Sequence, residues 1–273
     1  MEHLIDRALG VLRCPNCHAL KKFEHNRLGH MIHCGVCHVA YSYGAGFLDF
    51  MPDFTPSDGL AQRFMENKYV VDVYERYFRP AFTALGSPIK YHEEEAWLKA
   101  IDSPRPVKTV LDLAAGTGRY ARMLADLHQP EIVFAADISE PMIRKGVEIC
   151  AAKGYSNILY MRADAHHLPF SDASIDRINC FGALHLFPDP PQAIKELGRV
   201  GAEQAIFSCL AACEYHSGWQ KPLQALFTRF ATFTFFAVDD LNKYLQSAHF
   251  SSMKPLQKEM LLMFEATREV TAP

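Results

Sequence analysis

From residue 107 onward, short apolar runs alternate with segments whose hydrophobic residues recur at helical spacing. This alternation constrains the fold more than any other feature, because strands joined through helices pair in parallel and need helices over their sheet. The runs that predict strands are 107–114, 131–138, 156–164, 174–183, 203–211, 251–256 and 258–266. The pattern predicts an α/β fold with a Rossmann-like, doubly wound, mainly parallel seven-stranded sheet.

The first predicted strand runs into a glycine-rich turn. In VLDLAAGTGRY (110–120) the chain leaves a strand, turns at Gly116 and Gly118 and enters a helix. Glycine permits positive φ and lets a ligand approach the backbone closely. Asp137 stands at the end of the next strand, where a carboxylate can accept hydrogen bonds from a ribose diol. These features together predict a site for a nucleoside-containing cofactor.

Asp112 discriminates between two classes of cofactor. The segment GTGRYA fits the dinucleotide form G-x-G-x-x-A, but Asp112 lies on the approach to the turn and would repel a pyrophosphate. A cofactor with an amino group and a cationic sulfur would not be repelled. The motif therefore favours S-adenosylmethionine over NAD, and the alternative is a plain βα turn in a flavodoxin-like domain.

Residues 112–118 resemble the first motif of the class I S-adenosylmethionine-dependent methyltransferases, with Ala114 in place of the first glycine. The resemblance covers about residues 105–265. It implies that Asp137 binds the ribose, that Asp164 faces the adenine amino group and that Ala165 lines the adenine pocket. The full set of expected cofactor residues is Asp112, Ala114, Gly116, Gly118, Asp137, Ile138, Asp164, Ala165, Phe181 and Tyr74.

Tyr74 belongs to this set because of the helix expected over residues 60–80. The spacing of apolar residues predicts that helix, which is broken or ends before Pro80. In the resembled family a helix at this place commonly forms a lid over the cofactor. Simple packing of its apolar face is the alternative.

Four of the eight cysteines form two tight pairs near the N-terminus. Cys14 and Cys17 make one C-x₂-C pair, Cys34 and Cys37 make another, and sixteen residues separate the pairs. This spacing is typical of a tetrahedral Zn²⁺ site, and four thiolates leave no open position, so the expected zinc is structural. His18 and His38 could each replace a thiolate, but more often such residues are exposed. The other four cysteines read as buried apolar residues.

The cysteine segment resembles zinc ribbons attached to methyltransferases. The ribbon ends in a short apolar Leu-Asp segment, and LHLFPDP (184–190) follows the fourth main strand. Both features resemble relatives of the ubiquinone/menaquinone C-methyltransferases, a methyltransferase type 11 group. We therefore expect a zinc ribbon over 1–50, a helical linker or lid over 51–104 and an S-adenosylmethionine-binding domain over 105–273.

His185 is the candidate catalytic residue. It lies in the loop just past the fourth main strand, where ligands of open α/β sheets bind. It could act as a base or contact the substrate, and local packing of a loop histidine is an equal alternative. The Phe-rich run 227–238 could wall an apolar substrate pocket, although such runs more often belong to a core.

These features predict a cytoplasmic S-adenosylmethionine-dependent methyltransferase that acts on a small, partly apolar molecule. One alternative is an rRNA or tRNA methyltransferase whose ribbon recognises RNA. Residues 1–50 carry five basic and four acidic residues, and the whole chain has a net charge of −3, which disfavours that alternative. The other alternative is a non-catalytic binding protein that retains the fold. No membrane span and no secretory signal are expected.

Overall fold

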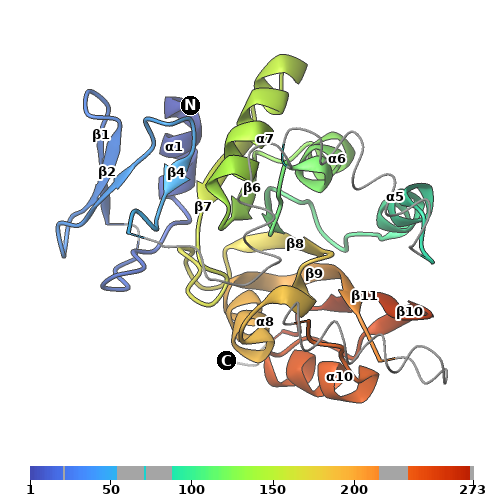
Figure 1. Ribbon diagram of the computed structural model, residues 1–273. Coiled ribbons are helices and arrows are strands. Elements are labelled where there is room, and N and C mark those ends of the chain that lie inside the picture. Colours follow the sequence, from blue (N-terminus) through green and yellow to red (C-terminus); the bar gives the residue numbers. More distant parts are fainter. Residues whose placement is uncertain (21, 54–70, 72–87, 215–232, 271–273) are drawn as a thin grey trace.

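The computed structural model describes residues 1–20, 22–53, 71, 88–214 and 233–270 (Figure 1). Their main feature is a large sheet with the strand order β10-β11-β9-β8-β5-β6-β7-β4. The strands are β4 (Leu48–Asp49), β5 (Thr109–Leu113), β6 (Ile132–Asp137), β7 (Ile158–Arg162), β8 (Ile175–Phe181), β9 (Gly201–Ala212), β10 (Lys254–Lys258) and β11 (Leu261–Thr267).

The predicted Rossmann-like architecture is confirmed in its centre and differs at both edges. Strands β4 to β9 pair in parallel, whereas β11 pairs antiparallel with both β9 and β10, so the sheet is mixed. The expected number of seven strands is wrong, because the described residues form eight. The additional strand is β4, whose two residues are too few to produce a period-2 signal in the sequence.

The strand order changes direction between β5 and β8. The chain passes from β5 to β6 and β7 on one side, and then crosses to β8 and β9 on the other. At such a switch point the two loops that leave adjacent strands diverge and open a crevice at the carboxyl ends of the strands. The glycine turn after β5 and the loop after β8 both lie at this point.

Helices cover both faces of the large sheet. Side chains of α6 (Arg119–His128) and α7 (Glu140–Lys153) share a buried apolar cluster with one face of β5, β6 and β7. Helices α8 (Pro190–Val200) and α10 (Val238–Ser247) pack on the opposite face. Helix α5 (Tyr91–Ala100) lies on the α6 side and contributes Leu98 to a third cluster with Tyr120 and Phe181 (Figure 1).

The N-terminal residues cover the part of the α8 face that lies over β6 and β7, where the chain places no crossover helix. Residues 163–174, all described, join β7 to β8 without a helix. Helix α1 (Glu2–Leu9) takes that place, and its Ile5 is fully buried in one cluster with Phe134 of β6 and Met161 of β7. Two main-chain bonds fix the connection, because Arg13 N donates to Pro169 O and Ser171 N donates to Val11 O. Helix α1 is therefore part of the main core.

A small antiparallel sheet follows α1. It consists of β1 (Phe23–Asn26), β2 (Met31–Cys34) and β3 (Ala40–Ser42), with β2 in the centre. After β3 the chain returns to the large sheet as β4, where Leu48 pairs with Met161. The segment predicted as a zinc ribbon thus contributes a strand to the sheet that bears the glycine turn. Within the described residues, no helix is both long enough and apolar enough to span a bilayer.

Candidate functional site

The turn after β5 is built on residues with positive φ. Ala114 has φ of 55°, Gly116 of 55° and Gly118 of 77°, and Gly118 caps α6. A residue with a Cβ, such as Ala114, costs about 1–2 kcal/mol in this left-handed region. Ala114, which stands in place of the first glycine of the resembled motif, therefore adopts the same left-handed backbone region as Gly116 and Gly118, at a cost in stability.

Asp137, the last residue of β6, holds this turn in place. Its Oδ2 accepts a hydrogen bond from Gly116 N at 2.6 Å, and its Oδ1 accepts one from Ser139 N at 2.9 Å. Burial raises the pKa of Asp137, while these N–H donors oppose that shift by favouring the charged form. Each carboxylate oxygen retains acceptor capacity, because it can take about two hydrogen bonds. A ribose diol could use that capacity.

The two glycines of the turn face different surroundings. A Cβ added at Gly116 would meet nothing within 4 Å, so this backbone borders open space that a ligand can fill. A Cβ at Gly118 would overlap the hydroxyl oxygen of Tyr160. The open cradle at Gly116 fits a bound cofactor, whereas Gly118 is required by the protein itself.

Tyr160 of β7 supports the turn from inside the fold. Its hydroxyl donates to Thr117 O at 3.0 Å, and Arg122 Nη1 donates to the same carbonyl at 2.6 Å. A Cβ at Gly146 in α7 would also overlap the Tyr160 ring. Burial raises the pKa of Tyr160, so the phenol stays protonated and remains a donor.

Asp112 lies in a buried polar chain that crosses three strands. Its Oδ1 accepts a hydrogen bond from Asn179 Nδ2 at 2.6 Å, and Asn179 Oδ1 accepts one from Ser208 Oγ at 3.0 Å. All three side chains are buried. The hydrogen bonds fix the Asp112 carboxyl group near the end of β5, where the glycine turn begins.

The loop after β7 carries the predicted adenine contacts. Asp164 is half-buried, and its Oδ1 accepts hydrogen bonds from His166 N at 2.9 Å and from His166 Nδ1 at 2.7 Å. Burial alone would raise the pKa of Asp164, but the hydrogen bonds from His166 and His167 outweigh it, so the pKa is lowered. Ala165 packs beside the main core, and the Ile138 carbonyl accepts from Arg162 Nε at 3.3 Å.

Aromatic side chains surround the end of β8. Phe181, its last residue, is 4.8 Å from the ring of Tyr120 and 6.1 Å from that of Trp97, measured between centroids. A few residues later, the ring of His185 lies 4.9 Å from that of Phe233. Phe181 and His185 therefore place two groups of aromatic rings at and just beyond the carboxyl end of β8.

His185 is nearly buried in the short helical turn η2 (Leu184–Leu186). Its Nδ1 accepts a hydrogen bond from Ala212 N at 3.3 Å, which assigns the ring proton to Nε2. Burial lowers the pKa of His185 to about 4, so the ring is neutral at neutral pH. A neutral ring with its proton on Nε2 donates a hydrogen bond there, which favours a substrate contact over a base.

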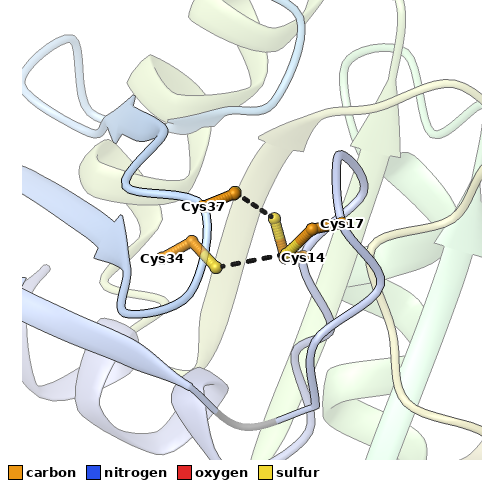
Figure 2. Close-up of side chains that lie close together, drawn as sticks. All are labelled: Cys14, Cys17, Cys34 and Cys37. Carbon is orange, nitrogen blue, oxygen red and sulfur yellow. Dashed lines mark hydrogen bonds between the residues drawn. The ribbon is translucent and has the colours of Figure 1, made fainter.

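The four N-terminal cysteines come together between two knuckle turns (Figure 2). Their Sγ atoms all lie within 4.8 Å of one another. Cys14 Sγ is 3.7 Å from Cys37 Sγ, and Cys17 Sγ is 3.5 Å from Cys34 Sγ. Tetrahedral Zn–S bonds of about 2.3 Å require S···S separations of about 3.8 Å. The arrangement therefore fits one zinc ion.

Neighbouring groups shift the thiol pKa values of this cluster in opposite directions, because burial and the adjacent thiols raise the pKa of Cys17 to about 12. Hydrogen bonds from the Asn16 side chain and the Val39 backbone lower the pKa of Cys37 to about 6. Tyr41 Oη lies 3.5 Å from Cys14 Sγ, where it can donate to a thiolate. His18 and His38 hold positive φ in the knuckle turns and are outside the four-ligand cluster, as expected.

Comparisons with known proteins agree with this geometry. Residues 110–204 match the family described as a methyltransferase domain. An uncharacterized chloroplastic methyltransferase of Arabidopsis thaliana is 25% identical over 250 residues, which cover 86% of this chain and 69% of the plant protein. The chain carries an S-adenosylmethionine-dependent methyltransferase domain.

Two further comparisons place this methyltransferase among its relatives. The demethylmenaquinone methyltransferase of Geobacillus stearothermophilus is 30% identical over 133 residues, which cover 47% of this chain and 57% of that enzyme. The phosphoethanolamine N-methyltransferase 2 of Haemonchus contortus, solved with S-adenosyl-L-methionine, shares the fold with a TM-score of 0.62 and 12% identity. That likeness covers 76% of this chain and 60% of the Haemonchus protein, and at this identity it shows the fold alone.

The structure brings most of the predicted methyltransferase residues to one edge of the sheet. They lie at or just beyond the carboxyl ends of β5, β6, β7 and β8. Tyr74 and most of the predicted 60–80 helix lie outside the described residues. Tyr160, Asn179 and Arg162 were not predicted as site residues from the sequence. Gly146, a glycine inside an otherwise regular helix, was the available signal for Tyr160, because such a glycine often marks a close contact.

The open space at Gly116 gives a first prediction. Gly116→Ala places a methyl group in the open cradle, and we expect it to weaken binding of S-adenosylhomocysteine at least tenfold by calorimetry. Gly154→Ala is the matched control, because Gly154 also has positive φ and open space but lies at the end of α7. Both substitutions should destabilise folding by about 1–2 kcal/mol. Equal affinities in the two variants would contradict a cofactor cradle at Gly116.

Burial of His185 gives a second prediction, measured by urea unfolding from pH 7 to pH 4. The pKa of His185 is about 4 in the folded state, below the ordinary 6.5 of the unfolded chain. Its contribution to stability is therefore present above pH 6.5 and is lost, by up to about 3 kcal/mol, as the pH falls towards 4.

His185→Gln should lose less stability over this range, because glutamine can still accept from Ala212 N without taking up a proton. Burial also lowers the pKa of His128 to about 4, and this contribution is common to both proteins. Parallel curves for the two proteins would show that His185 titrates normally.

Proposed function

We propose that the protein transfers a methyl group from S-adenosylmethionine to a small, partly apolar acceptor, and that the acceptor is an aromatic ring of the quinol type. The observation that carries the proposal is the aromatic border of the β8 end, formed by Phe181, Trp97, His185 and Phe233. Flat aromatic surfaces favour an acceptor with its own ring. Relatives named as demethylmenaquinone methyltransferases support the quinol class.

The chain supplies binding groups for the cofactor along the sheet edge. We assign Asp137 to the ribose, Asp164 and Ala165 to the adenine, and Gly116 to the open cradle. When bound, S-adenosylmethionine supplies an electrophilic methyl group on a cationic sulfur. The buried Asp112 side chain lies near the start of this turn and, as a carboxylate, offsets positive charge in the cofactor.

The chain's remaining task is to position the acceptor. Methyl transfer depends mainly on in-line placement, and placement can supply much of the rate. His185 Nε2–H can donate to a quinol oxygen and orient the ring, since Nδ1 is already engaged by Ala212 N. In the overall transfer the C–S bond breaks, a bond to the acceptor forms, and the acceptor releases a proton to solvent.

We propose further that Cys14, Cys17, Cys34 and Cys37 hold one structural zinc. The four thiols complete a tetrahedral set, so no position remains for a reacting water. Zinc here stabilises the turns between α1 and β4 rather than taking part in the transfer.

The charges of the N-terminal segment give the RNA alternative little support. Arg27 pairs with Asp6 at 2.6 Å, Arg13 pairs with Asp172 at 3.1 Å, and Arg7 Nη1 donates to Glu131 O at 2.9 Å. Arginines engaged within the protein are less able to neutralise phosphates.

An acceptor assay tests the proposed function. We expect methyl transfer from labelled S-adenosylmethionine to a reduced, demethylated naphthoquinol, and at least a tenfold lower kcat/KM for Asp137→Asn because the ribose contact is weakened. Lys243→Ala is the control, since this exposed lysine on α10 pairs with Asp240 of the same helix. Methylation of RNA with steeply salt-dependent binding, and none of the quinol, would overturn the small-molecule assignment.

Metal analysis tests the zinc assignment. We expect one zinc per chain in the wild-type protein and less than a tenth of that in Cys14→Ser, because three thiolates and a hydroxyl bind zinc far more weakly. Cys150→Ser is the control, as Cys150 lies buried in α7 apart from the cluster. Zinc contents that are equal in Cys14→Ser and wild type would contradict the four-cysteine site.

A further inference from the structure

The N-terminal segment reaches the cofactor loops through one strand. After the fourth cysteine, β4 pairs with β7 so that Leu48 lies opposite Met161 and Asp49 lies opposite Arg162. Phe50 N then donates to Arg162 O at 3.0 Å. Arg162 is the last residue of β7, two residues before Asp164. Thus β4 is fixed beside the loop that carries the predicted adenine contacts.

The Arg162 side chain lies between β4 and the loop after β6. It is nearly buried, and its Nη1 is 3.7 Å from Asp49 Oδ2 and 3.6 Å from Glu140 Oε2. Its Nε donates to Ile138 O at 3.3 Å. One guanidinium therefore contacts an acid of the N-terminal segment, an acid of α7 and the carbonyl that follows Asp137.

The loop after β6 begins at Asp137, whose carboxylate holds the glycine turn. Ile138 lies between Asp137, which accepts from Gly116 N, and Ser139, whose N–H donates back to Asp137 Oδ1. A shift of the Ile138 carbonyl would move the Asp137 carboxylate with it. The contacts thus run without interruption from Asp49 through Arg162 and Ile138 to the turn at Gly116.

We propose that Arg162 is a positioning residue, which uses β4 as an anchor to hold the Asp137–Glu140 loop in its cofactor-binding arrangement. This inference rests on the proposed function, because it assigns that loop to S-adenosylmethionine. Without the guanidinium, Asp49 and Glu140 lose the positive charge that lies between them. Glu140 keeps its pair with Arg144, but the bridge from β4 to the loop is broken. Order in the N-terminal segment then contributes to cofactor affinity.

The proposal includes an energetic coupling between the two ends of this path. Metal binding at the four cysteines orders the chain that ends in β4. If β4 supports the cofactor loop, removal of the metal weakens cofactor binding, and a bound cofactor strengthens metal binding by the same free energy. The coupling passes through Arg162, so it is reduced when that side chain is removed.

Calorimetric titration of the full chain with S-adenosylhomocysteine tests the positioning role. For metal-loaded protein we expect at least a tenfold weaker affinity in Arg162→Met and a smaller loss in Asp49→Asn. Arg13→Met is the matched control, because Arg13 also joins the N-terminal segment to the body, through Asp172, but none of its contacts is with the Asp137–Glu140 loop. Its affinity should remain within twofold of wild type.

A second titration follows chelation of the metal. We expect at least a fivefold loss of affinity in the wild type and less than a twofold further loss in Arg162→Met. If Arg162→Met does not unfold cooperatively, Asp49→Asn decides, since it removes only the β4 side of the contact. Wild-type affinity in both Arg162→Met and Asp49→Asn would overturn the positioning role.

Cofactor binding by the wild-type protein distinguishes a failure of the proposed function from a failure of this inference. A wild-type protein that binds no S-adenosylhomocysteine would overturn the cofactor assignment and this inference with it. A wild-type protein that binds the cofactor but no metal would overturn the coupling, while the comparison of Arg162→Met with Arg13→Met would still decide the positioning role.

Discussion

The carboxylate of Asp137 is the interaction on which the sheet edge depends. With one oxygen it accepts the N–H of Gly116 in the turn after β5, and with the other it accepts the N–H of Ser139 at the start of α7. Two neighbouring loops are thus fixed by a single side chain. A neutral group would give weaker hydrogen bonds, because bonds to an ionised acceptor are roughly twice as strong. The edge is preorganised for a ligand by a carboxyl group that also retains acceptor capacity for the ligand.

Tyr160 imposes a second constraint from below the same turn. Its ring fills the space between Gly118 and Gly146, and its hydroxyl bonds to the Thr117 carbonyl. The first turn of α6 and the middle of α7 can approach β7 this closely only because both positions lack a side chain. Gly118 and Gly146, which lie in different helical segments, therefore both make room for the buried Tyr160 ring. Gly116 instead borders the open space for the ligand.

Much of the fold could be predicted because its signals are local. The run 132–136 is apolar at every position, and the spacing of Cys14, Cys17, Cys34 and Cys37 alone indicated a four-ligand cluster that the structure brings together. The features that were missed depend on distant partners. Strand β4 is defined by its pairing with Met161, and the proton position of His185 is defined by the N–H of Ala212. No local pattern near either segment reports such a contact.

The pairing of β4 with β7 has a consequence for the order of folding during synthesis. Leu48 leaves the ribosome more than a hundred residues before Met161, its partner in the sheet. At about 5–20 residues per second the early segment waits roughly ten seconds for the strand that completes it. During that interval the apolar face of α1 has no sheet to cover. If the proposed four-cysteine site takes up zinc at that stage, it closes locally and gives the nascent segment a defined shape until β7 is available.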